Sequence, residues 1–166
     1  MITILEATSN DIKTIQDIVY TTWPLTYGEI LSLEQLQYML DLFYSEDVLK
    51  KQMVEKEQLF YLIQDDNDSV LGFIGIEHNY QNKAFTKIHK IYLLTETQGK
   101  GIGKLTIETI GKLARENKST SLLLNVNRFN KALHFYEKIG FKVIDEVNIE
   151  IGNGFLMEDY IMEKLI

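Results

Sequence analysis

The chain contains no cysteine and only one proline among its 166 residues. The lack of cysteine excludes disulfides, cysteine-based zinc sites and thiol nucleophiles, and it fits a reducing compartment. No apolar run reaches about 18 residues, so we expect a cytoplasmic protein with no membrane partner. His89 and His134 have no metal-ligand spacing with other ligands, and we expect no metal.

Positive charge is also scarce, since the formal net charge is −7 at pH 7. We therefore expect no nucleic-acid partner. The whole excess of negative charge falls between Gly28 and Asp68, a segment with ten acidic residues, Glu29 among them, and three lysines. This segment is either a set of solvated helix faces or a field that attracts a cationic ligand. The length and the 45% hydrophobic content suit one domain over residues 1–166.

Apolar spacing predicts helices in the first third of the chain and mainly short strands after it. The first helix should follow the N-cap Ser9–Asp11 and end at Pro24, and the second should carry a capping box of Ser32 and Gln35. Expected helices are 33–44, 46–56, 104–116 and 130–139, and expected strands are 2–6, 59–64, 70–77, 85–94, 121–126, 141–149 and 155–164.

These elements predict an α/β fold of mixed α+β type with a central, mostly antiparallel sheet flanked by helices. Strands 59–64, 70–77 and 85–94 should form an antiparallel meander, and a βαβ crossover should place strand 121–126 parallel to its neighbour. In the crossover helix we expect four apolar residues to face the sheet, namely Ile102, Leu105, Ile110 and Leu113.

The segment from Gln98 to Gly103 reads Q-G-K-G-I-G and joins the predicted strand 85–94 to the helix 104–116. A strand that turns through glycines into a helix presents unpaired backbone N–H groups, which bind anions. A P-loop would need Gly at position 98 and Ser or Thr at position 105, where this chain has Gln98 and Leu105. A dinucleotide-binding fingerprint would need Gly at position 104, where this chain has Lys104. Both nucleotide motifs are thereby excluded, and an ordinary tight βα turn remains the alternative.

A second segment, from Asn130 to Phe141, reads N-K-A-L-H-F-Y-E-K-I-G-F. Ala132 and Tyr136 are one helical turn apart, so a small residue and a ring share one face. Together, the two segments resemble the signatures of the GNAT superfamily of acyl-CoA-dependent N-acetyltransferases, in the same order and about 30 residues apart. The resemblance covers nearly the whole chain, and segments 22–27 and 125–130 look like the bacterial spermidine/spermine N-acetyltransferases.

The resemblance implies acetyl-CoA as co-substrate and direct transfer of the acetyl group to a primary amine in a ternary complex. The loop amides would hold the CoA pyrophosphate, with Gly101 and Gly103 allowing close approach, and the sheet would splay at the acyl-CoA site. An N–H near Leu93 would stabilise the oxyanion, and Tyr136 would protonate the thiolate. The expected cofactor-binding residues are Ile91, Tyr92, Leu93, Gln98, Gly99, Lys100, Gly101, Ile102, Gly103, Lys104, Asn130 (with Asn127 as the alternative) and Tyr136.

On the acceptor side, Glu77 is the expected base for the amine, acting through water, with an ordinary surface carboxylate as the alternative. Strand alternation should point His78 to the other face. The acceptor site is expected to be walled by Trp23, Tyr27 and Tyr44 through cation–π contacts, with Glu29 beside them, core packing being the alternative.

The expected acceptor is a small-molecule polycation such as spermidine or spermine. A protein N-terminus, a lysine or an aminoglycoside is the alternative acceptor. A non-catalytic acyl-CoA-binding sensor is the alternative from another class of protein. Either a monomer or a homodimer is compatible with the sequence.

Overall fold

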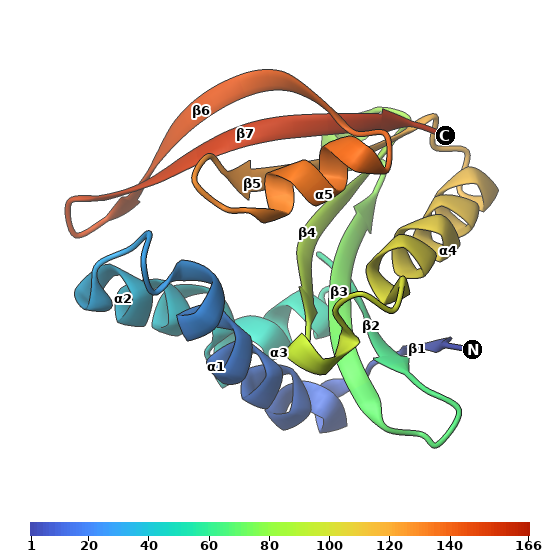
Figure 1. Ribbon diagram of the computed structural model, residues 1–166, viewed down its shortest axis with the longest axis horizontal. Helices are drawn as coiled ribbons and strands as arrows, with labels where there is room; N and C mark the ends of the chain where they lie inside the picture. The colour runs from blue at the N-terminus through green and yellow to red at the C-terminus, as the bar shows by residue number, and fades with distance from the viewer. The chain divides into compact units, whose positions relative to one another are not determined.

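A computed structural model describes residues 1–166 as a mixed α/β fold (Figure 1). Its seven strands are hydrogen-bonded in the order β1-β2-β3-β4-β5-β7-β6. No helix is both long enough and apolar enough to cross a lipid bilayer. The elements are β1 (Thr3–Glu6), α1 (Ile12–Tyr27), α2 (Leu33–Tyr44), α3 (Glu46–Val54), β2 (Leu59–Gln64), β3 (Val70–His78), β4 (Phe85–Leu93), α4 (Ile102–Glu116), β5 (Ser121–Asn127), α5 (Ala132–Lys138), β6 (Lys142–Gly152) and β7 (Phe155–Leu165).

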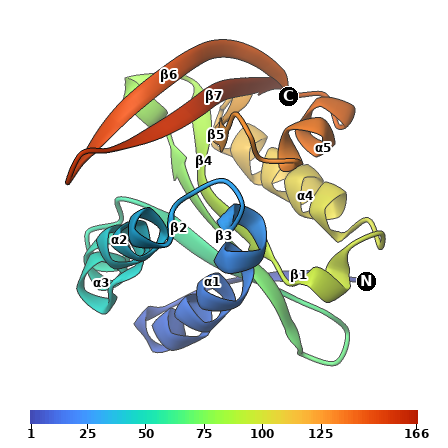
Figure 2. The same cartoon turned by 60° about the vertical axis from the view of Figure 1, so that its left-hand side comes forward.

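The chain forms two compact units, and it passes between them at the end of β3, within β4 and within α4. Unit 1 comprises residues 1–77 and 89–110. In it, β2 pairs antiparallel with both β1 and β3, as the predicted meander requires. Helices α1, α2 and α3 pack together (Figure 2), and the ring of Tyr44 on α2 contacts that of Phe73 on β3. The predicted strands and helices of this unit are confirmed to within a few residues.

The predicted end of the first helix at Pro24 is wrong, because α1 continues through this proline to Tyr27. Proline lacks the N–H that would bond to the carbonyl four residues earlier, so one helical hydrogen bond is lost. The next turn still closes, since the Gly28 N–H donates to the Pro24 carbonyl at 3.0 Å. Ring packing of Trp23 on Tyr27, with centroids 4.8 Å apart, stabilises this last turn.

Unit 2 comprises residues 78–88 and 111–166. Its parallel pairing joins residues 85–88 of β4 to residues 121–124 of β5, which confirms the predicted crossover. Strand β7 lies between β5 and β6 and is antiparallel to both. The β6–β7 hairpin turns through Gly152, Asn153 and Gly154, all of which have positive φ. The sequence predicted both strands of this hairpin, but it did not predict that the last strand, β7, lies inside the sheet and not at its edge.

Helix α4 buries Ile110 as predicted and half-buries Ile102 and Leu113, but Leu105 departs from the predicted face. Ile107, Ile110 and Ala114 are buried, whereas Leu105 is 40% exposed. Leu105 and Ile107 are two residues apart and therefore point in nearly opposite directions around a helix of 3.6 residues per turn. The expectation that Leu105 faces the sheet is therefore wrong.

Candidate functional site

The glycine-rich loop belongs to unit 1 and joins β4 to α4. Gly99 and Gly101 have φ of +74° and +73°, a backbone conformation that residues with a Cβ rarely adopt. Gly103 instead lies within α4, so the positions that need glycine for conformational reasons are 99 and 101. Leu105 N–H donates to the Gly101 carbonyl at 3.1 Å. The N–H groups of residues 102–104 precede this bond and have no carbonyl partner within the helix.

The segment that enters the loop is anchored by local hydrogen bonds. The buried Thr97 hydroxyl donates to the Leu94 carbonyl at 2.7 Å, and Leu94 N–H donates to the Leu71 carbonyl of β3 at 2.8 Å. Gly72 allows this close approach, because a Cβ there would lie 2.4 Å from the Tyr92 carbonyl oxygen. The helix N-terminus is thus held with its positive dipole end behind the loop, an arrangement that favours an anion.

A cluster of aromatic rings from α1, α2 and β4 lies in unit 1. Ring centroids of Trp23 are 4.8 Å from Tyr27, 5.4 Å from Tyr44 and 5.8 Å from Tyr92. The hydroxyls of Tyr27 and Tyr92 are 3.0 Å apart. Burial raises the pKa of Tyr44 well above its usual value, and Tyr27 adds to the rise, while the nearby Tyr92 and Trp23 oppose it.

This burial revises the predicted acceptor wall. Trp23 is 3% exposed and Tyr44 is 2% exposed, so both rings form core packing. The Trp23 indole N–H makes no hydrogen bond of acceptable geometry, although it lies near the Tyr44 hydroxyl. Tyr27 is partly exposed and Glu29 is exposed. Of the four predicted acceptor residues, only these two present surface to solvent.

Lys90 of β4 is a buried amine that the sequence prediction did not include. It is 7% exposed, and its Nζ donates to Gln52 Oε1 at 3.0 Å and to Gln58 Oε1 at 2.9 Å. The same nitrogen lies 5.8 Å from the Tyr44 ring centroid and 5.2 Å from that of Phe60. Burial lowers the pKa of Lys90 to about 7, against an opposing effect of Glu57. The one signal in the sequence was a lysine within an apolar run.

Glu77 at the end of β3 faces His89 of β4. Their closest atoms, Glu77 Oε2 and His89 Nε2, are 3.6 Å apart, and both side chains are partly exposed. The adjacent His78 is engaged elsewhere, since its Nδ1 lies 2.8 Å from the hydroxyl of Thr86, which lies 2.7 Å from that of Ser119. Burial lowers the pKa of His78. The two neighbouring residues thus have separate environments, as the alternation of a strand requires.

In unit 2, α5 carries Tyr136, and a loop with two asparagines precedes it. Tyr136 is 8% exposed, and its ring contacts Phe135 and Phe141 with centroids 5.4 and 5.6 Å away. The Asn130 Oδ1 accepts from Ala132 N–H at 2.9 Å at the start of α5, and the Asn127 Oδ1 accepts from Phe129 N–H at 2.9 Å. Both asparagine side chains therefore shape the turn that positions the tyrosine helix.

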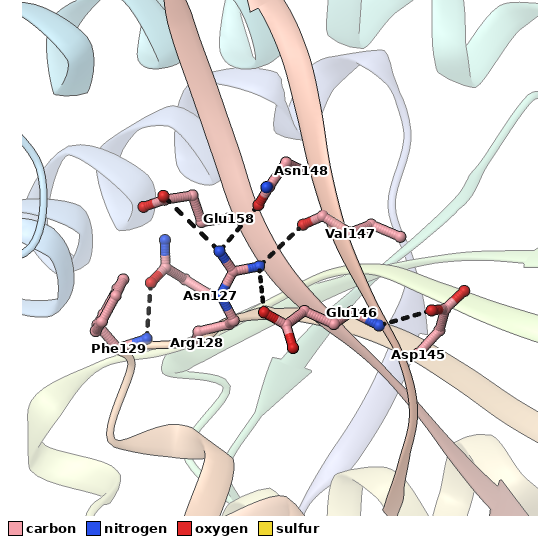
Figure 3. Close-up of polar contacts among 8 residues, drawn as sticks. All are labelled: Asn127, Arg128, Phe129, Asp145, Glu146, Val147, Asn148 and Glu158. Atoms are coloured by element: carbon pink, nitrogen blue, oxygen red, sulfur yellow. Dashed lines mark hydrogen bonds and ion pairs between the residues drawn. The ribbon is translucent and has the colours of Figure 1, made fainter.

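Arg128, between these asparagines, ties the turn to the β6–β7 hairpin (Figure 3). Its guanidinium donates to the Val147 carbonyl at 3.3 Å and to Asn148 Oδ1 at 2.9 Å. It also pairs with the carboxylates of Glu146 at 3.4 Å and Glu158 at 3.8 Å. A planar guanidinium can bridge two strands in this way because its donors form a rigid fork. Arg128 thus links the turn before α5 to both strands of the hairpin.

A largely buried cluster of polar side chains from β4, β5 and β7 lies in the same unit. Lys87 donates to Asn125 Oδ1, and its Nζ lies 5.2 Å from the Tyr80 ring centroid. Asp159 is buried beside them. Burial raises the pKa of Asp159, while Asn125 and the charges of Lys87 and Arg128 oppose the rise. The sequence offered no signal for this group beyond polar residues inside strand patterns.

The fold and the glycine loop define an acetyltransferase of the GNAT type. A family model described as acetyltransferase (GNAT) domain matches residues 30–164, so the chain belongs to this family and is an N-acetyltransferase enzyme. The resemblance inferred from the two sequence motifs is confirmed, and so is the predicted fold class.

Three relatives cover nearly the full chain. An uncharacterized N-acetyltransferase of Bacillus subtilis, YuaI, is 29% identical over 160 residues, which are 95% of this chain and 90% of the relative. A spermidine N(1)-acetyltransferase of Thermoplasma acidophilum is 28% identical over 152 residues, 89% of this chain and 90% of the relative. The crystal structure of the PaiA N-acetyltransferase of T. acidophilum, in complex with coenzyme A, superposes with a TM-score of 0.81 at 26% identity, covering 100% of this chain and 99% of that one.

Proposed function

We propose that this enzyme transfers an acetyl group from acetyl-CoA to a primary amine, and that the acceptor is a small polycation such as spermidine or spermine. The proposal that acetyl-CoA is the donor rests on the loop of Gly99 and Gly101, which leads into the N-terminus of α4. The complex of the PaiA relative with coenzyme A supports the same donor. The acceptor half rests on the acidic segment 28–68 and on the relative named spermidine N(1)-acetyltransferase.

In this proposal the amides of Gly99 and of residues 101–104 hold the pyrophosphate of CoA at the positive end of the α4 dipole, since the N–H groups of Gln98 and Lys100 already donate to the carbonyls of Thr95 and Thr97. Lys100 and Lys104 add positive charge, although Lys104 also lies 3.9 Å from Glu108 on the exposed side of the helix. The backbone of residues 91–93 binds the pantetheine arm. The Asn130 amide nitrogen contacts the cofactor, while its oxygen keeps the bond to Ala132 N–H.

The chemistry is direct attack of the neutral amine on the thioester. A backbone N–H near Leu93 stabilises the tetrahedral oxyanion, a contact worth roughly 3 to 4 kcal/mol. The Tyr136 hydroxyl gives a proton to the leaving thiolate, a role for which a phenol is suited because its O–H can donate. On the acceptor side, Glu77 favours removal of the ammonium proton, and Tyr27 and Glu29 contact the cationic chain.

Substituting Gly101 with alanine tests the loop. The residue has φ of +73°, and a Cβ at this position would have no other atom within 4 Å, so no neighbour blocks the variant. The left-handed backbone costs about 1 to 2 kcal/mol for alanine, and the new methyl group covers amides that would bind phosphate. We expect the Kd for CoA to rise about tenfold, measured by calorimetry, with little change in kcat.

Gly154→Ala is the matched control, because this hairpin glycine has φ of +78° and equally open surroundings. Both variants should lose similar thermal stability, but only Gly101→Ala should bind CoA more weakly. Equal CoA affinity in the two variants would show that the loop does not hold the cofactor.

Release of the CoA thiol, followed with acetyl-CoA and a panel of amines, tests the whole proposal. We expect saturable turnover with spermidine and spermine, because acidic residues outnumber lysines ten to three in segment 28–68. A preference for aminoglycosides, lysine or peptide N-termini over polyamines would replace the acceptor class. Tight binding of CoA without turnover on any amine would make the protein an acyl-CoA sensor and contradict the proposed function.

A further inference from the structure

The turn between β5 and α5 carries both asparagines that are candidates for contacting the cofactor. The hydrogen bonds of Phe129 and Asn130 are local, since Asn130 N–H donates to the Asn127 carbonyl at 3.0 Å and Phe129 N–H donates to Asn127 Oδ1 at 2.9 Å. Local bonds of this kind set the shape of a turn but not its place against the rest of the fold. Phe129 is 64% exposed and gives the turn no buried anchor.

Arg128 supplies the bonds that connect this turn to a distant part of the chain (Figure 3). The pairing of β5 with β7 ends at Asn127, opposite Asp159. The next residue, Arg128, extends this contact, because its backbone N–H donates to the Glu158 carbonyl at 2.9 Å. The main chain of the turn is therefore attached to β7.

The guanidinium of Arg128 adds a second attachment, to both strands of the hairpin. Its Nη2 lies 2.9 Å from Asn148 Oδ1 and 3.8 Å from Glu158 Oε1, and these two residues are opposite each other in the β6–β7 register. Its Nη1 lies 3.3 Å from the Val147 carbonyl oxygen and 3.4 Å from Glu146 Oε1. A planar fork that contacts four groups is held in one orientation, which a single ammonium would not be.

These contacts favour a positioning role over a mainly stabilising one. The Arg128 side chain is 14% exposed, but its carboxylate partners Glu146 and Glu158 are 63% and 45% exposed. Ion pairs with carboxylates so open to solvent contribute little to stability. The hairpin also has its own ladder, which joins residues 142–152 to residues 155–163. What Arg128 adds is the place of the turn relative to the hairpin.

We propose that Arg128 is a positioning residue for the cofactor and acts through the side-chain amides of Asn127 and Asn130; this rests on the proposed function. The fork holds the turn against the β6–β7 hairpin, so that the Asn130 amide nitrogen is directed at CoA while its oxygen keeps the bond to Ala132 N–H. The guanidinium does not touch CoA in this role, because the hairpin groups occupy both of its terminal nitrogens.

The effect should fall on cofactor affinity and not on the chemical step. Tyr136, the proposed acid, is buried and held by ring packing on Phe141, with centroids 5.6 Å apart. This contact does not involve Arg128, so kcat at saturating acetyl-CoA should change little when the fork is lost.

The test replaces Arg128 with glutamine, which loses the charge and the fork, and with lysine, which keeps the charge alone. We expect the Kd for CoA, measured by calorimetry, to rise about tenfold in Arg128→Gln and about fivefold in Arg128→Lys. In thiol-release assays KM for acetyl-CoA should rise in parallel, while kcat stays within about twofold of that of the unmodified enzyme. A purely structural role would lower the melting temperature and leave the CoA affinity of the folded protein unchanged.

Arg115→Gln is the matched control, because it removes a positive charge from an exposed position in the last turn of α4, in the same unit. Its Kd for CoA should equal that of the unmodified protein. Asn148→Ala and Glu158→Gln each remove one contact of the fork and should raise the Kd about two- to threefold. These two milder variants carry the test if Arg128→Gln does not fold.

A double-mutant cycle identifies the residue through which Arg128 acts. Asn130→Asp removes the amide nitrogen but keeps the oxygen that accepts from Ala132 N–H. Asn127→Asp likewise keeps the oxygen that accepts from Phe129 N–H. In at least one of these backgrounds Arg128→Gln should change the Kd for CoA by less than about twofold, because the contact that it positions is already lost.

Three outcomes would overturn the inference and leave the proposed function standing. The first is equal CoA affinity in Arg128→Gln and the unmodified protein. The second is full affinity in Arg128→Lys, or an equal loss in Arg115→Gln, which would assign the effect to charge alone. The third is an undiminished effect of Arg128→Gln in both aspartate backgrounds. Failure of the unmodified protein to bind CoA would overturn the proposed function together with the inference.

Discussion

Replacing Tyr136 with phenylalanine is expected to lower kcat for acetyl transfer about 100- to 1000-fold while leaving the affinity for CoA nearly intact. Phenylalanine keeps the ring that contacts Phe135 and Phe141 at 5.4 and 5.6 Å, so the packing at the end of α5 should persist. What is lost is the hydroxyl that protonates the leaving thiolate in the proposed mechanism. The measurements are steady-state thiol release and calorimetric binding of CoA.

Tyr20→Phe provides the control, because Tyr20 lies on α1 with 47% of its surface exposed. It also loses a phenol hydroxyl but should retain full activity. Unchanged turnover in Tyr136→Phe would exclude this residue as an essential acid. A large rise in the Kd for CoA would instead indicate that the hydroxyl serves binding and not proton transfer.

Replacing Lys90 with methionine is expected to remove a pH dependence of stability in the neutral-to-alkaline range. Burial lowers the pKa of Lys90 from 10.5 to about 7, so between these values the unfolded chain holds a proton that the folded chain does not. Stability therefore rises with pH across this window, and the penalty for burying the charge is fully present below pH 7. For one such group the gain between pH 7 and pH 9 is about 2 kcal/mol.

Urea unfolding of the Lys90→Met variant and the unmodified protein at pH 7, 8 and 9 measures this gain as a difference. The free energy of unfolding of the variant, relative to that of the unmodified protein, should be highest at pH 7. Between pH 7 and pH 9 the free energy of unfolding of the unmodified protein should rise by about 2 kcal/mol more than that of the variant. Lys112→Met, at an exposed position of α4, should show a constant difference. A constant difference in Lys90→Met as well would mean that Lys90 keeps its proton throughout.

Local signals in the sequence were sufficient for most of the fold. Alternation and helical spacing identified every strand and α-helix, and the parallel pairing of β4 with β5 followed from the strand–helix–strand order of the chain. Errors arose where tertiary packing overrode a local preference. Pro24 is accommodated within α1 because Trp23 and Tyr27 pack at the helix end. Leu105 is exposed because α4 buries the face of Ile107 and Ile110.

The glycine loop was predictable because its function depends on the backbone. Glycines at 99 and 101 are needed for positive φ, and the following helical pattern shows where the dipole begins. The family followed from this loop together with the Asn130 to Phe141 segment, and the match over residues 30–164 confirms it. The residues that bind the acceptor were harder to predict from the sequence, because aromatic residues also pack in protein cores, as Trp23 and Tyr44 do here.

The sequence by itself therefore determined the class of enzyme, the order of the elements and the position of the anion-binding loop, because each of these depends on residues close together in the chain. Only the tertiary structure decided which distant residues meet. It placed β7 between β5 and β6, buried Lys90 among Gln52, Gln58 and two rings, and brought His89 to Glu77. These outcomes depend on strand register and helix packing, where a shift of one residue reverses which face a side chain occupies.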